Sequence, residues 1–114
     1  MQPRSVQIFC RIIDNFGDAG VTLRVARRFF AEGVAPLLIS DHLEVLAKLL
    51  PELDPTVPRS TVEGIGVADW DAFAAAPDAP ADLVLETFGC RLPEGFEKRM
   101  AATPPKLTMN IDYL

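Results

Sequence analysis

An apolar run, a short turn and an amphipathic segment open this chain and restrict its possible folds more than any other feature does. Residues 6–13 predict a buried strand, and residues 21–30 predict a helix. Residues 14–20 between them read DNFGDAG, a short turn that contains glycine. Units of this kind build open α/β sheets, in which ligands bind at the carboxyl ends of the strands.

Apolar and helical segments continue to alternate along the rest of the chain. Residues 35–40 form a continuous apolar run, as expected of a strand covered on both faces. Asp41, with Glu44 three residues later, has the capping-box spacing of a helix that Pro51 ends. The remaining segments are a weaker strand at 62–67, a short helix at 70–76, a strand at 82–86, a helix opened by Pro93 and a strand at 106–111. This alternation predicts an α/β fold, with a parallel sheet flanked by helices and joined by right-handed crossovers.

The composition excludes several classes of function. A chain of 114 residues, 49% hydrophobic and with a net charge of −5, is typical of one globular domain. Its acidic balance argues against nucleic acid as a partner. No apolar run has the length of a membrane span and the N-terminus lacks the apolar core of a signal peptide, so we expect a cytoplasmic protein. Cys10 and Cys90 read as small buried thiols, and with the single His42 they form no metal-binding pattern, so we expect no metal.

Two carboxylates, Asp14 and Asp18, distinguish the first turn from a dinucleotide-binding loop. Such a loop brings backbone amides to a pyrophosphate, whereas these like charges flank the place of the anion. The pair therefore favours acid/base chemistry, although Asp18 also suits the N-cap of the following helix. Asp14 either enters a cleft or is held by loop amides. Phe16 either fills the core or forms a stacking surface at the mouth of a site.

Glu86 adds a third acidic side chain to this hypothesis. It ends another predicted strand, so in a parallel sheet it lies at the same edge as Asp14. Three carboxylates at one edge could bind a cation, or hold and deprotonate a basic group. The alternative for Glu86 is a solvated strand end.

Several segments resemble the elongation factor P–arginine rhamnosyltransferases in the same order and with the same spacing. They are IFCRIIDNFGDAGV at 8–21, LRVAR at 23–27, PELDP at 51–55, ETFGCRLP at 86–93 and NIDYL at 110–114. The resemblance covers essentially the whole chain. The sequence departs from the family at Ala19, Thr22 and Asp112, where a bulkier aliphatic residue, Cys or Ser, and Glu are more usual. None of these departures removes a carboxylate of the turn.

The resemblance implies a GT-B glycosyltransferase, which has two Rossmann-like domains facing each other across a cleft. Residues 1–114 would then form the N-terminal, acceptor-side domain, and the C-terminal domain that holds the nucleotide sugar would be absent from this chain. The family transfers rhamnose from TDP-β-L-rhamnose to an arginine of elongation factor P and inverts the anomeric centre. We therefore expect elongation factor P and a nucleotide sugar as partners, no cofactor, and a monomer.

Carried onto this sequence, the loop aspartates of the family are Asp14 and Asp18, with Asp18 as the general base. The resemblance assigns Asn15, Phe16, Gly17 and Gly20 to the sugar end of the cleft, and Glu86 is a possible acceptor-side residue. The chemistry agrees with this assignment, because a guanidinium is a poor nucleophile that paired carboxylates hold in forked hydrogen bonds. A carboxylate can then accept the proton as the new bond forms.

Two other functions are alternatives. One is a non-catalytic module of the same origin that binds the acceptor protein, and we expect the chain alone to bind elongation factor P weakly and to transfer no sugar. The other is a receiver-like signalling domain, which needs adjacent acidic residues after the first strand and a phosphorylatable aspartate after a middle strand. Asp14 and Asp18 are four positions apart and no such middle-strand aspartate is evident, so the sequence disfavours the receiver.

Overall fold

A six-stranded sheet forms the centre of the computed structural model, which describes residues 2–12 and 15–111 and gives only the backbone of residues 15 and 16. In pairing order the strands are β3 (Arg59–Val62), β4 (Ile65–Asp69), β2 (Ala35–Ser40), β1 (Ser5–Cys10), β5 (Leu83–Thr87) and β6 (Leu107–Ile111). The pairs from β4 to β6 are parallel, whereas β3 runs antiparallel to β4. The α/β prediction is confirmed, and the mostly parallel sheet is compatible with a Rossmann-like domain.

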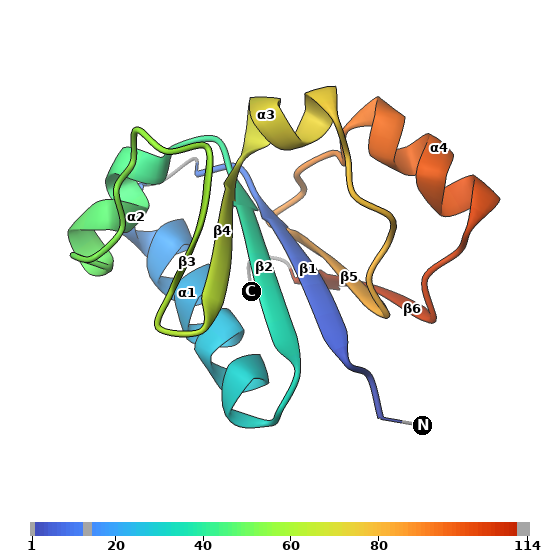
Figure 1. The fold of residues 1–114 in the computed structure, drawn as a ribbon, viewed down its shortest axis with the longest axis horizontal. Helices are drawn as coiled ribbons and strands as arrows, with labels where there is room; N and C mark the ends of the chain where they lie inside the picture. The colour runs from blue at the N-terminus through green and yellow to red at the C-terminus, as the bar shows by residue number, and fades with distance from the viewer. Residues whose placement is uncertain (1, 13–14, 112–114) are drawn as a thin grey trace.

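Helices cover both faces of the sheet, as Figure 1 shows. α1 (Asn15–Ala31) and α2 (Leu43–Leu49) lie on one face, and α3 (Trp70–Ala75) and α4 (Glu94–Ala102) lie on the other. The second face has an aromatic core, in which the Phe9 ring lies 5.8, 5.5 and 4.9 Å from the rings of Trp70, Phe73 and Phe96. Each helix of the described residues is too short or too polar to cross a lipid bilayer.

The strand order places a topological switch point between β1 and β5. The chain builds outward from β1 through β2 to β4, and then α3 carries it back to β5 on the other side of β1. The connections leaving the carboxyl ends of β1 and β5 therefore go to opposite faces of the sheet, an arrangement that in folds of this class leaves a crevice between them. The β1 end is Cys10 and the β5 end is Thr87.

The first strand–helix unit differs from the prediction at both inner boundaries. β1 ends at Cys10 and not at residue 13, and α1 begins at Asn15 and not at residue 21. Gly17 and Gly20, which the sequence placed in a turn between strand and helix, lie in the first turns of α1. Ala19 and Leu23 are buried against the sheet, and their packing stabilises the longer helix. These tertiary contacts outweigh the weak helix propensity of the glycines.

The weaker strand predicted at 62–67 is confirmed in part, because residues 65–67 belong to β4, but Val62 ends β3 and a hairpin turn separates the two strands. β3 and β4 meet at Glu63 and Gly64, whose φ angles are 52° and 82°. Positive φ at both central residues is the geometry of the tight hairpin turn that suits the twist of a sheet. The hairpin makes β3 an antiparallel edge strand, so the fully parallel pattern of the prediction is wrong.

We expect Gly64→Ala to lower the free energy of unfolding by about 1–2 kcal/mol, because an L-residue is strained at this φ. An added Cβ would also lie 2.3 Å from the ring of Phe30, which would have to move. Gly20→Ala is the matched control, since nothing lies within 4 Å of its Cβ position inside α1 and a gain of about 0.5–1 kcal/mol is expected. Urea denaturation measures both, and equal stability of Gly64→Ala and the unchanged protein would contradict the turn geometry.

Candidate functional site

Asp18 lies in the first turn of α1, on the side that faces the sheet. Only 2% of this residue is exposed, although carboxylates are rarely so buried. The partial positive charge of a helix N-terminus stabilises a carboxylate in the first turn and offsets part of the cost of burial. The expectation that Asp18 is the N-cap is wrong, because the helix begins three residues before it.

Asp18 belongs to a group of buried polar residues that we call the switch-point cluster. Its members are Cys10, Asp18, Thr22 and Thr87, and none is more than 2% exposed. They come from the end of β1, the first turns of α1 and the end of β5. The structure thus places Asp18 beside the crevice where ligands bind in folds of this class.

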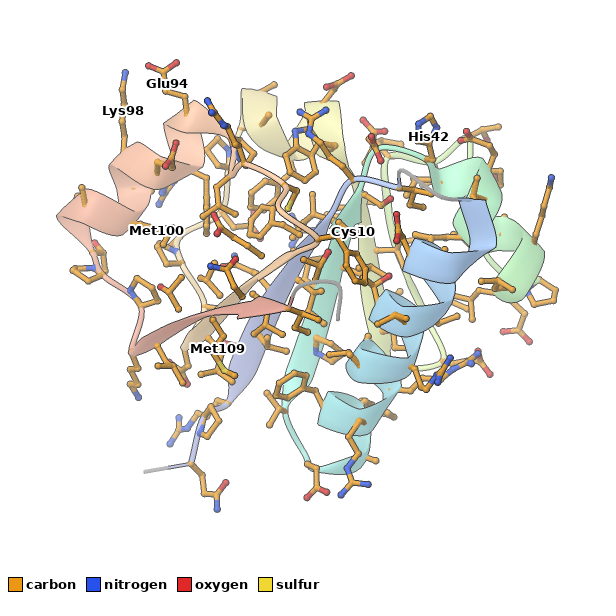
Figure 2. All side chains as sticks on the ribbon, turned by 180° about the vertical axis from the view of Figure 1, so that it is seen from behind. Cys10, His42, Glu94, Lys98, Met100 and Met109 are labelled. Atoms are coloured by element: carbon orange, nitrogen blue, oxygen red, sulfur yellow. The ribbon has the colours of Figure 1, made fainter. Side chains whose placement is uncertain are left out.

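The Cys10 thiol lies at the middle of the cluster, and Figure 2 shows it deep in the molecule between the sheet and α1. Burial raises the pKa of Cys10 to about 11; the hydroxyl groups of Thr87 and Thr22 oppose this shift, and the charge of Asp18 adds to it. The thiol therefore stays protonated at neutral pH and is a poor nucleophile. The prediction of a small buried thiol is confirmed for Cys10 and for Cys90.

The threonine hydroxyls of the cluster donate to backbone carbonyls. Thr22 Oγ1 donates to the carbonyl oxygens of Asp18 and Ala19 over 3.0 and 3.1 Å. Thr87 Oγ1 donates to the carbonyl oxygen of Phe9 over 2.8 Å. Sequence reasoning did not select these two threonines, although Thr22 follows Asp18 by one helical turn, a spacing that puts both on one helix face.

The other residues predicted for the turn have separate positions. Asp14 lies outside the described residues, and the side chains of Asn15 and Phe16 do too. Gly17 is exposed and Gly20 is half-buried, and both belong to α1 and not to a loop. The space beside Gly20 is open, because no heavy atom lies within 4 Å of its Cβ position.

Glu86 lies near the carboxyl edge as expected, but on the other face of the sheet from Asp18. It pairs with Phe9, whose side chain belongs to the aromatic core under α3 and α4. Partial burial raises the pKa of Glu86, and the charge of Glu97 on α4 adds to this effect. The sheet therefore separates Glu86 from Asp18. Within the described part of the chain, no three His, Cys, Asp or Glu side chains gather as metal ligands would.

The chain leaves β5 through a strained turn beside the crevice. Phe88 has a φ of 54°, which is uncommon for a bulky residue. Its N–H donates to the Ile111 carbonyl over 2.6 Å, and Cys90 Sγ donates to the Phe9 carbonyl over 3.3 Å. The Phe9 carbonyl thus accepts from both Thr87 and Cys90, and these bonds hold the turn against the end of β1.

Asp41 accepts a hydrogen bond from the backbone that follows β1 and does not cap α2. Its Oδ1 accepts a hydrogen bond from the Ile12 N–H over 2.9 Å, which satisfies a backbone group just after the strand. His42 occupies the N-cap position without a side-chain capping bond, so the predicted capping box is wrong. Glu44 instead contacts His42, with 2.8 Å between Oε1 and Nδ1.

This contact makes the titration of His42 testable. The hydrogen bond to Glu44 raises the pKa of His42 above 6.5, and the charge of Asp41 acts in the same direction. A raised folded-state pKa means that the pair stabilises the fold fully below the unfolded pKa, and that this contribution is lost as the pH rises through the folded pKa. We expect Glu44→Gln to lower the pKa of His42 in an NMR titration. Glu52→Gln, an exposed control just after α2, should leave it unchanged; equal values in all three proteins would contradict the contact.

The fold and the position of Asp18 define a class, a Rossmann-like α/β domain with a buried carboxylate at its switch point. Residues 6–114 match the family model described as Elongation-Factor P (EF-P) rhamnosyltransferase EarP. The match covers more than half of the chain, so this chain belongs to the EarP family.

Three similar proteins, each named protein-arginine rhamnosyltransferase, agree with this assignment. The chain is 42% identical over 109 residues to the protein from Pseudomonas putida, covering 94% of this chain and 29% of the relative. It is 40% identical over 112 residues to that from Pseudomonas aeruginosa, covering 96% and 30%. It is 44% identical over 110 residues to that from Neisseria meningitidis, covering 94% and 28%. The chain therefore spans less than a third of the length of these relatives.

Proposed function

We propose that this chain is the N-terminal, acceptor-side domain of a protein-arginine rhamnosyltransferase that modifies elongation factor P. The observation that carries the proposal is the family match over residues 6–114. The names of the relatives supply the reaction and the family description supplies the acceptor. The buried carboxylate at the switch point supports the proposal independently, because the reaction needs a base at a ligand crevice.

The donor in this proposal is TDP-β-L-rhamnose, bound mainly by a second Rossmann-like domain of a GT-B enzyme. Such an enzyme needs no cofactor, because helix N-termini can stabilise the departing diphosphate. We further propose that it acts as a cytoplasmic monomer. Asn15, Phe16, Gly17 and Gly20 would line the sugar end of the cleft.

Asp18 has the role of general base in this reaction. An arginine nitrogen attacks the anomeric carbon, the bond from that carbon to the diphosphate oxygen breaks, and the anomeric centre inverts. The attacking nitrogen becomes acidic as its bond to carbon forms, and Asp18 accepts the proton. A free guanidinium holds its protons tightly, with a pKa far above neutral pH, so a carboxylate is needed where the charge develops. Asp14 would supply the second carboxylate that holds the planar cation.

Sugar transfer tests the proposal directly. We expect the full-length protein, given TDP-β-L-rhamnose and elongation factor P, to add one deoxyhexose to a single arginine, as located by peptide mass spectrometry. Replacing that arginine by lysine should abolish the product, because an ammonium lacks the planar fork. The 114-residue chain alone should transfer no sugar. An unmodified acceptor with the full-length protein would contradict the proposed function, and transfer by the isolated chain would contradict the assignment of the donor site to a second domain.

Asp18→Asn keeps the size and shape of the side chain and removes its basicity. In the full-length protein we expect kcat to fall at least about 100-fold, the usual contribution of a general base. Asp71→Asn is the matched control, since it makes the same change in the first turn of another helix, α3, where the side chain is exposed, and its kcat should stay within about twofold. Turnover near the unchanged level in Asp18→Asn would restrict Asp18 to a structural role.

A further inference from the structure

Thr22 places a hydroxyl in the buried core, where packing alone would favour an apolar side chain. The residue is fully buried on the face of α1 that meets the sheet, and its neighbours on this face are the apolar Ala19, Leu23 and Ala26. A buried hydroxyl destabilises a core unless its hydrogen bonds are made. Valine has the same shape and no such requirement. Packing therefore does not explain why this position carries a hydroxyl.

The hydroxyl bonds to the backbone of the turn that carries Asp18. Its proton is shared between the carbonyl oxygens of Asp18 and Ala19, at 3.0 and 3.1 Å. Threonine hydroxyls that bond back to the preceding turn adjust the local path of a helix. This bond thus acts on the backbone from which the Asp18 side chain extends.

The Thr22 hydroxyl also lies beside the sheet. The side chains of Thr22 and Thr87 both lie within reach of the Cys10 thiol, whose pKa they lower. Thr87 Oγ1 donates to the Phe9 carbonyl and Thr22 Oγ1 donates to the helix, so backbone hydrogen bonds fix the hydroxyls on both sides of the thiol. Buried polar side chains therefore extend from the end of β5, past the end of β1, to the turn of Asp18.

We propose that Thr22 is a positioning residue for Asp18, which fixes the backbone of the first turns of α1 beside the carboxyl ends of β1 and β5. The inference rests on the proposed function, in which Asp18 accepts a proton from the acceptor. A base must lie within hydrogen-bond reach of the proton it takes, and a misplacement of about 1 Å can reduce the rate about 100-fold. Thr22 acts through the backbone of Asp18 and does not itself touch the substrate.

The test compares two substitutions of Thr22 in the full-length protein. Thr22→Val removes the hydroxyl and keeps the shape, so kcat should fall at least tenfold while the KM for TDP-β-L-rhamnose stays within about twofold. Thr22→Ser keeps the hydroxyl and should restore kcat to within about threefold. Ser40→Ala is the matched control, because Ser40 is also fully buried, pairs with Cys10 across the sheet and lies outside the cluster. Its kcat should stay within about twofold.

Several outcomes overturn the inference. They are a kcat of Thr22→Val within twofold of the unchanged protein, an equal loss in Thr22→Ser, and an equal loss in Ser40→Ala. If Thr22→Val does not fold, Thr22→Ala removes the same hydroxyl with a smaller side chain, and an unchanged kcat there overturns the inference as well. Two parallel measurements separate the proposals. No sugar transfer by the unchanged full-length protein refutes the proposed function, and full turnover in Asp18→Asn refutes the role of Asp18 as base. Loss in Asp18→Asn with full turnover in Thr22→Val refutes only the positioning role.

Discussion

The burial of a carboxylate at the junction of α1, β1 and β5 is the constraint on which the rest of the site depends. A charge taken out of water destabilises a fold unless dipoles and hydrogen bonds compensate for it. Here the N-terminus of α1 provides the dipole, and the hydroxyl and thiol groups of the switch-point cluster provide polar surroundings. The inner face of α1 therefore carries the polar Asp18 and Thr22 beside Ala19 in its first turns and is apolar from Leu23 onward.

This constraint also links the fold to the chemistry. The fold leaves a crevice where β1 and β5 send their connections to opposite faces, and the cluster puts an acidic group beside it. A base in a site with little water acts on a guanidinium more strongly than it would in solution, because nearby charges are weakly screened. The burial of Asp18, which costs stability, would also make its carboxylate a more effective base.

The architecture was largely predictable from local patterns. The strand at 35–40 and the helix that begins at Trp70 are confirmed, because continuous apolar runs and proline punctuation define them without tertiary information. The start of α1 was not predictable, since Gly17 and Gly20 resemble a turn until the packing of Ala19 is known. The hairpin at Glu63 was missed for a related reason, because glutamate seldom adopts positive φ and gives no turn signal.

The site was predictable in its acidic residue types and not in its geometry. In the sequence, Asp18 follows a predicted strand within a short glycine-containing segment, which is a local signal. The approach of Thr87 to Cys10 depends on β5 pairing with β1, and that depends on the direction in which α3 crosses the sheet. The face on which Glu86 lies depends on strand register in the same way. Such pairings join residues more than 70 positions apart, so no local pattern records them.

A crystal structure of the full-length protein with elongation factor P would measure the proposed contact between Asp18 and the acceptor. We expect a guanidinium nitrogen of the acceptor arginine within about 3 Å of an Asp18 carboxylate oxygen, on the α1 side of the crevice between β1 and β5. An acceptor arginine held by other residues, with the Asp18 carboxylate bonded only to groups inside the domain, would contradict it.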